Sequence, residues 1–209
     1  MKSKRLLAIA SFIEKNDSVL DLGCDHGYLA IYLKKNNLCK NVIASDISSN
    51  ALDFAKNNIK KYQVDIKTYL SDGLNNIKDF YDTIVIAGMG THSIIKILND
   101  KELPPKIILA SNNDYPLLRK FMNSIGYYLE KELVVLEKDK YYIVMLYIIK
   151  EKKLKKTEIL FGKNNNIEYY QYLYDKNLSI LKRTSLAKKI QLYYENIILK
   201  KLIRSIEKK

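Results

Sequence analysis

Residues 18–27 read SVLDLGCDHG, and the fold can be predicted outward from this stretch. Its first half is a short apolar run typical of a buried strand. Its second half is a glycine-containing turn that opens into the helical pattern of residues 28–36. Glycines at such a turn let a ligand approach the backbone near the helix N-terminus. A dinucleotide site would show GxGxxG here, whereas this chain has an acid, Asp21, followed by only Gly23 and Gly27.

The acid at the end of this strand narrows the kind of ligand. A carboxylate repels a pyrophosphate and attracts a cationic amino group, such as that of the amino-acid tail of S-adenosylmethionine. We therefore predict S-adenosylmethionine as the cofactor, bound around Asp21, Gly23, Cys24 and Asp25. A turn with a purely structural role is the alternative interpretation of this motif.

Outward from this stretch, apolar runs alternate with helical patterns. The predicted strands are 18–22, 41–45, 65–70, 82–87 and 106–110, and the predicted helices are 2–15, 28–36, 48–61, 91–99 and 115–125. Alternation of this kind indicates a parallel sheet covered by helices on both faces. Two further β-rich runs, 127–137 and 140–149, predict an antiparallel hairpin. Together these elements predict an α/β fold with the Rossmann-like sheet of class I methyltransferases.

The chain after residue 150 has a different character. A charged connection over 150–163 precedes two segments in which apolar residues recur at helical spacing and form a stripe along one face. The break between the two segments lies near Thr184-Ser185. The stripes are Ile167, Tyr170, Tyr174, Leu178 and Leu181, then Leu186, Ile190, Tyr193, Ile197, Leu202 and Ile206. We expect an antiparallel helical hairpin, and therefore a catalytic domain over 1–150 and a helical extension over 151–209.

Positive charge is concentrated in this extension. Residues 150–209 contain 16 basic and 6 acidic side chains, whereas residues 1–149 contain 20 and 17. AT-rich codon usage explains a general excess of lysine, but it does not explain why acidic residues fail to balance that excess only after residue 149. The distribution favours an anionic partner, such as a nucleic acid, that docks on the extension.

Two more acids follow the second and third predicted strands. Asp46, with Ile47 beside it, can accept hydrogen bonds from both hydroxyls of a ribose. Asp72, followed by Gly73, can accept a hydrogen bond from an adenine amino group. Taken singly, the first is equally a helix cap and the second a turn. The fourth strand ends in Ala87-Gly88-Met89, where glycine permits close approach to the methyl donor; a tight structural turn is the alternative.

Five segments resemble the bacterial tRNA (adenine-22-N1)-methyltransferase family: SKRLLAIASFI at 3–13, DLGCDHGYLAI at 21–31, SDGL at 71–74, DTIVIAGMG at 82–90 and Phe161-Gly162. The resemblance covers essentially the whole chain. It departs from the family at Thr91, where a second glycine is usual, and at Ala110-Ser111, where Gln-Pro usually precedes the asparagine that is Asn112 here.

The resemblance implies methyl transfer from S-adenosylmethionine to N1 of an adenine in tRNA. On this basis we expect His26, Asn112 and Asp25 to contact the target base. Seven basic residues are expected to contact tRNA: Arg5, Lys182, Arg183, Lys188, Lys189, Lys200 and Lys201. Two other function classes stay open, namely a methyltransferase for a small molecule or protein and a non-catalytic RNA-binding module.

The remaining features exclude several classes. No apolar run approaches the roughly 20 residues that a membrane-spanning helix needs. Two cysteines and two histidines make neither a disulfide framework nor a good metal site. We therefore expect a cytoplasmic protein without a metal or membrane partner, and nothing in the sequence implies a protein partner.

Overall fold

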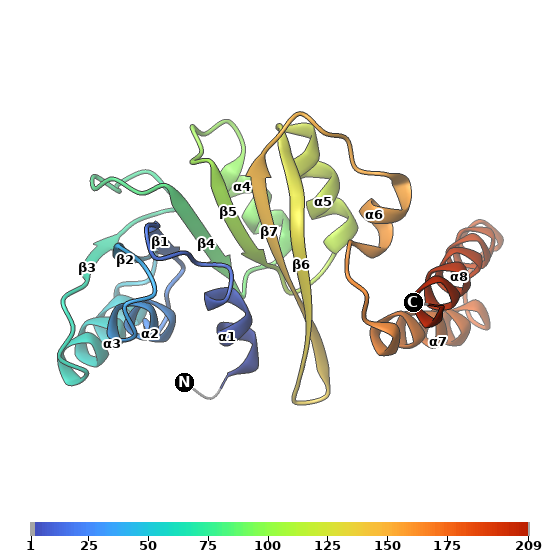
Figure 1. Cartoon of the computed structure of the whole chain (residues 1–209), viewed down its shortest axis with the longest axis horizontal. Coiled ribbons are helices and arrows are strands. Elements are labelled where there is room, and N and C mark those ends of the chain that lie inside the picture. Colours follow the sequence, from blue (N-terminus) through green and yellow to red (C-terminus); the bar gives the residue numbers. More distant parts are fainter. Residues whose placement is uncertain (1–2, 209) are drawn as a thin grey trace. The chain divides into compact units, whose positions relative to one another are not determined.

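The computed structural model describes residues 3–208. The chain divides after Leu154 into two compact units, an N-terminal and a C-terminal one. The N-terminal unit is built on a single seven-stranded sheet with strand order β3-β2-β1-β4-β5-β7-β6 (Figure 1). β1 to β5 run parallel, and β7 pairs antiparallel with both β5 and β6. The strands are β1 Ser18–Leu22, β2 Asn41–Asp46, β3 Lys67–Leu70, β4 Thr83–Ala87, β5 Lys106–Ala110, β6 Tyr127–Glu137 and β7 Lys140–Ile149.

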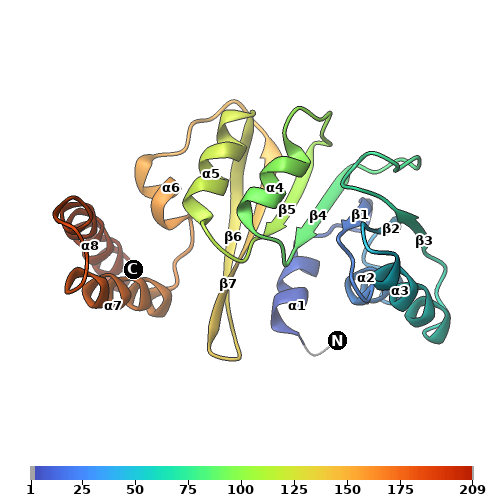
Figure 2. The same cartoon turned by 180° about the vertical axis from the view of Figure 1, so that it is seen from behind.

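Helices cover both faces of this sheet. Alternate residues of the strands, including Val19, Val85 and Ile108, form one core with α1, α2 and α3. The opposite face is covered by α4 and α5, which lie in front of the strands in Figure 2. This confirms the predicted α/β class. The five helices are α1 Lys4–Ala10, α2 Tyr28–Lys35, α3 Ser49–Lys61, α4 Thr91–Leu98 and α5 Tyr115–Ser124.

A buried ion pair ties α5 to the sheet. Arg119 Nη2 lies 2.8 Å from Glu132 Oε2, and both side chains are almost completely buried. Burial of each ion costs several kcal/mol of desolvation. Removal of one partner would leave the other charge buried and unpaired, and would therefore strongly destabilise the fold.

The C-terminal unit contains three helices, α6 Lys156–Phe161, α7 Ile167–Leu181 and α8 Leu186–Glu207. α7 and α8 pack against each other and are joined by a short turn at 182–185. The amide of Asn177 on α7 donates to Asn196 Oδ1 on α8 over 3.0 Å. The two helices form the helical hairpin that the sequence predicts.

Three details differ from the predictions. The first helix ends at Ala10 rather than at 15, because the backbone turns at Ser11, and Phe12 and Ile13 stay buried outside it; position 2 lies outside the described residues. The charged connection over 150–163 contains α6, which begins where the Glu158 carboxylate accepts a hydrogen bond from the backbone amide of Lys155.

The third difference concerns the stripe predicted on α8. Leu186, Ile190, Tyr193 and Ile197 are between 56% and 75% exposed, whereas Leu192, Asn196, Ile198 and Leu199 are buried. α8 carries apolar residues on more than one face, so periodicity alone did not select the face that packs. Leu178 on α7, also predicted to be internal, is 41% exposed. In the described part of the chain, no helix combines the length and apolar character needed to cross a membrane.

Candidate active site

Two adjoining cavities of about 440 Å³ each lie at the edge where the parallel strands β1 to β4 end. They share Gly23 and Met89, which form the boundary between them. After the roles that the sequence predicts for their residues, we call the first the catalytic cavity and the second the adenosine cavity. The catalytic cavity contains Asp21, Cys24, Asp25, His26, Ala87, Gly88 and Asn112, and the adenosine cavity contains Asp46, Ile47, Asp72 and Gly73.

This arrangement brings every predicted cofactor and catalytic residue to one edge. Strand ends collect there because β1, β2, β3 and β4 are parallel neighbours. Within residues 3–208, no three His, Cys, Asp or Glu side chains gather in a way that would hold a metal ion.

Asp21 is the most perturbed acid of the site. Its side chain is buried in β1, and its Oδ2 atom has no hydrogen-bond partner. Burial raises the pKa of the Asp21 carboxyl to about 7; the backbone amide of Ala30 opposes this rise, and the charge of Asp46 adds to it. An orphaned carboxylate oxygen beside a cavity is suited to a cationic ligand group, which fits the amino group of S-adenosylmethionine.

Asp46 is held in a fixed orientation by the backbone around it. Its Oδ2 atom accepts from the amide of Asp25 over 3.0 Å, and its Oδ1 atom accepts from the amide of Ser48 over 2.9 Å. Ser48 itself caps α3 by accepting from the amide of Ala51. The capping role therefore belongs mainly to Ser48, and the remaining lone pairs of Asp46 are available to the adenosine cavity.

A side chain is disfavoured at both glycines of the turn that follows β1. Gly23 has φ +75°, and a Cβ there would collide with the methyl group of Met89. Gly27 has φ +70°, and a Cβ there would lie 3.2 Å from Cβ of Ala55, where α2 meets α3. Both positions favour glycine because of their positive φ, and at Gly27 the absence of a Cβ also lets α2 and α3 pack closely.

Asn112 is positioned by the turn that ends β4. Its backbone amide donates to the carbonyl of Met89 over 2.9 Å, and its Nδ2 atom donates to the carbonyl of Gly88 over 2.6 Å. These bonds leave its Oδ1 atom as an acceptor in the catalytic cavity. Asp114, two residues further along, caps α5 by accepting from the amide of Leu117.

An aromatic cluster forms the wall beside Asp25 and His26. The His26 ring lies 5.7 Å from the Tyr28 ring and 5.3 Å from the Phe54 ring, centroid to centroid. Its Nε2 atom is 3.7 Å from Asp25 Oδ2. Sequence reasoning missed Tyr28; its signal was a large aromatic residue at the first position of a helix that follows a ligand-binding turn.

The sequence predicts that Arg5 contacts tRNA, but it does not indicate that this side chain lies at the catalytic cavity. It lines the catalytic cavity beside Gly88, and its guanidinium lies 5.0 Å from the centroid of the Tyr142 ring. Its side chain can therefore meet an anionic group within the site itself.

Cys24 lines the same cavity, and its thiol is unreactive. Burial raises the pKa of its thiol strongly, and the charges of Asp21 and Asp46 raise it further. The thiol therefore stays protonated near neutral pH, so it is not an activated nucleophile.

The predicted tRNA-binding residues of the hairpin are almost all exposed. Lys182 and Arg183 follow α7, and Lys188 and Lys189 lie in the first turn of α8, so these four flank the same turn. Lys200 Nζ lies 5.2 Å from the centroid of the Tyr174 ring, and Lys201 is exposed beside it in the sequence.

Comparison with known proteins identifies the family. The family model described as "Methyltransferase domain" matches residues 2–145. The tRNA (adenine(22)-N(1))-methyltransferase of Bacillus subtilis is 32% identical over 151 residues, which are 69% of this chain and 63% of that protein.

Solved structures extend the likeness to the whole chain. The structure of M. capricolum TrmK in complex with S-adenosyl-homocysteine has a TM-score of 0.86 and 30% identity, and the match covers 99% of both chains. The crystal structure of the B. subtilis m1A22 tRNA methyltransferase TrmK has a TM-score of 0.81 and 26% identity, and the match covers 97% of this chain and 99% of that chain. With this fold, this edge of strand-end acids and these relatives, the chain belongs to the tRNA (adenine-22-N1)-methyltransferase family, TrmK.

Proposed function

We propose that this chain transfers a methyl group from S-adenosylmethionine to N1 of the adenine at position 22 of tRNA, the reaction for which its B. subtilis relative is named. The observation that carries the proposal is the junction of the two cavities at Gly23 and Met89. One cavity has the acids that suit a nucleoside with a cationic tail. The other has an aromatic wall and an oriented amide that suit a purine base.

The cofactor fits the residues that surround the junction. Asp21 would hold its amino group, Asp46 its ribose hydroxyls and Asp72 its adenine amino group, while Ile47, 66% exposed at the cavity, would cover the adenine face. When bound, S-adenosylmethionine supplies an electrophilic methyl group on a sulfonium.

Asn112 can orient the target base. N1 of adenine adjoins the exocyclic N6 amino group, so an acceptor that binds N6 also fixes the direction of N1. The Oδ1 atom of Asn112 is such an acceptor, because its Nδ2 atom is engaged by the Gly88 carbonyl. N1 of neutral adenine carries a free lone pair, so the residues need only position it, and orientation alone can supply a large part of the acceleration.

Access to N1 requires the base to leave its helix. N1 lies on the Watson–Crick edge, so a paired adenine cannot be methylated until it is unpaired and turned out into the cavity. His26 and Tyr28 provide an aromatic wall on which the extruded base can stack. The methylated base is cationic, and the Asp25 carboxylate at the same cavity favours that charge.

The basic helical hairpin would hold the body of the tRNA. We assign catalysis to residues 1–150 and tRNA binding to residues 151–209, whose exposed lysines suit phosphate contacts that position RNA without recognising its sequence. We also propose that Arg5 meets a phosphate of the target nucleotide, since it lines the catalytic cavity. Because tRNA is the substrate, we expect the activity in the cytoplasm.

The experiment that tests this function offers the alternatives in parallel. The full-length protein is incubated with labelled S-adenosylmethionine and either unmodified tRNA, a protein extract or a small-metabolite extract. Label in tRNA alone supports the proposal, and label in protein or small molecules supports the broader methyltransferase class. Cofactor binding by calorimetry without transfer to any of the three would indicate a non-catalytic RNA-binding module.

A further inference from the structure

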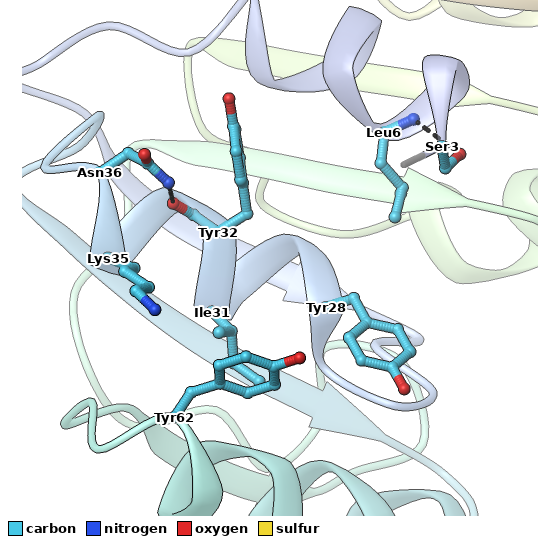
Figure 3. Close-up of a pocket in the computed structure, with 8 residues that line it drawn as sticks. All are labelled: Ser3, Leu6, Tyr28, Ile31, Tyr32, Lys35, Asn36 and Tyr62. Carbon is cyan, nitrogen blue, oxygen red and sulfur yellow. Dashed lines mark hydrogen bonds between the residues drawn. The ribbon is translucent and has the colours of Figure 1, made fainter. Parts of the chain in front are cut away.

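A third cavity, of about 590 Å³, lies on the outer face of α2 (Figure 3). α2 supplies its floor. Leu6 of α1 and the N-cap Ser3 border it on one side, and Tyr62, the C-cap of α3, borders it on the other. The lining residues of α2 are Tyr28, Ile31, Tyr32 and Lys35, and its C-cap Asn36 adds a fifth. We call it the tyrosine cavity. Neither the cofactor nor the target adenine uses it in the function proposed above.

The tyrosine cavity adjoins the catalytic cavity. Leu6 and Tyr28 line both, so Tyr28 has the target base on one side and the tyrosine cavity on the other. A group that enters the tyrosine cavity therefore lies next to the site of methyl transfer.

The lining of the cavity suits a flat, partly apolar group. Three tyrosines provide ring faces and hydroxyl groups, and Tyr28 and Tyr62 are 48% and 40% exposed. Aromatic rings left open to solvent gain free energy when a base stacks on them, and this gain does not depend on which base it is. The volume is sufficient for one nucleotide.

The charge around the cavity suits a phosphate. Lys35 Nζ lies 5.5 Å from the centroid of the Tyr62 ring, and the last turns of α2 and α3 both end in lysine pairs, Lys34-Lys35 and Lys60-Lys61. The acid that lies against Ser3, Glu137, is already engaged, because it accepts hydrogen bonds from the Ser3 hydroxyl and the Arg5 amide.

We infer that the tyrosine cavity binds the tRNA nucleotide directly adjacent to the methylated adenine, with its base stacked on Tyr62 and its phosphate facing Lys35. This inference rests on the proposed function. Turning one base out of a stacked strand exposes the face of its neighbour, and a second stacking site offsets that loss. The cavity therefore assists extrusion of the target without recognising its neighbour's identity.

The test pairs protein variants with altered tRNA. Full-length wild type and Tyr62→Ala are assayed with intact tRNA and with two tRNAs that lack the base either 5′ or 3′ of the target adenine. We expect Tyr62→Ala to raise KM for intact tRNA by roughly 5- to 100-fold, the range that loss of one stacked base gives. One of the two abasic tRNAs should raise the wild-type KM similarly, and it should add nothing further in Tyr62→Ala.

Three controls separate this role from general damage. Tyr62→Phe keeps the ring and should retain the wild-type KM, and Lys35→Gln should reduce the salt slope of tRNA binding by about 0.7–0.9, as removal of one phosphate contact does. The double variant Phe80→Ala with Lys78→Gln removes an exposed aromatic residue and a lysine from the loop before β4, and it should leave KM unchanged.

The outcomes are distinguishable. If the wild type does not methylate intact tRNA, the proposed function and this inference both fail. If it does, and the effects of Tyr62→Ala and of both missing bases are simply multiplicative, the inference alone is overturned. A normal affinity of Tyr62→Ala for S-adenosylmethionine shows that the variant is folded, so unchanged tRNA kinetics in that variant would also overturn the inference.

Discussion

The hydroxyl of Thr91 lies 2.8 Å from the hydroxyl of Ser111, and both residues are buried. These are the two places where the chain departs from the pattern usual in its family, so the departures are in direct contact. The Thr91 amide also donates to Asn113 Oδ1 over 3.0 Å. The pair thus fastens the loop that carries Asn112 to the turn at Gly88 and Met89.

Removal of either hydroxyl should destabilise the protein. Thr91→Val or Ser111→Ala removes one hydroxyl from a buried network that also includes the carbonyls of Met89 and Asn113, which costs about 1–3 kcal/mol in the free energy of unfolding. Because the two residues share one interaction, the double variant should lose less than the sum of the single losses. Urea denaturation of all four proteins measures this, and strict additivity would show that the two hydroxyls are not coupled.

Cofactor affinity should depend on pH through Asp21. With its pKa near 7 in the cofactor-free protein, this carboxyl is increasingly protonated as the pH falls below 7. A cationic ligand favours the carboxylate, so Kd for S-adenosylmethionine should rise towards tenfold per pH unit below about pH 7 and level off above it. Calorimetry between about pH 5.5 and pH 8 measures this, and a constant Kd would contradict the role of Asp21.

The same carboxyl should lower stability at neutral pH. Its pKa rises from 3.8 to about 7 on folding, so the folded state binds the proton more tightly. The stabilisation that this proton gives is complete at low pH and is lost as the pH rises towards 7.

Asp21→Asn should therefore stabilise the protein at pH 8 by on the order of 2–4 kcal/mol, with little change near pH 4, while weakening cofactor binding. Thermal denaturation at both pH values checks this. An equal shift in Tm at the two values would mean that the charge is not the cause.

Substitution of Asp46 should weaken the cofactor more than it weakens the fold. Asp46→Ala removes two charge-assisted bonds to ribose hydroxyls, each worth roughly 1.5–3 kcal/mol, so Kd should rise by a factor of about 150 or more. Asp82→Ala is a matched control. Asp82 directly precedes β4, accepts a hydrogen bond from the backbone amide of Ser18, and lies in neither cavity of the site. Wild-type affinity in a folded Asp46→Ala protein would remove Asp46 from the site.

The basic tip of the hairpin should determine the salt dependence of tRNA binding. Neutralising Lys182, Arg183, Lys188 and Lys189 should flatten the slope of log affinity against log salt by roughly 0.7–0.9 for each phosphate that the tip no longer binds. Affinity for S-adenosylmethionine should not change, because the residues proposed to bind it lie in the N-terminal unit. As a control, four exposed lysines of that unit are neutralised: Lys78, Lys120, Lys131 and Lys138. If the tip variant keeps the wild-type slope, its lysines are merely solvated.

Local sequence signals were sufficient for the sheet and for the acids at its edge. An apolar run bounded by Gly23 constrains both a strand and its turn, and parallel strands necessarily bring Asp21, Asp46 and Asp72 to one edge. Each of these inferences depends on a few neighbouring residues and one topological rule, so one sequence was enough.

Features that depend on distant packing could not be obtained in this way. Arg5 lines the catalytic cavity because α1 packs against β6 and β7, two strands that are far from α1 in the sequence. The face of α8 that packs includes Asn196, which bonds Asn177 of α7, and apolar periodicity does not register such a polar contact. Tyr62 belongs to a cavity because the end of α3 lies beside α2.

Mapping the methyl group on tRNA tests the proposed reaction most directly. Unmodified tRNA is incubated with the full-length protein and S-adenosylmethionine, and reverse transcription then locates the block that an N1-methyl group places on Watson–Crick pairing. We predict one new stop immediately 3′ of the adenine at position 22, mass-spectrometric detection of 1-methyladenosine, and loss of both when that adenine is replaced by guanine. A stop at another nucleotide, or methylation that survives the replacement, would contradict the proposed reaction.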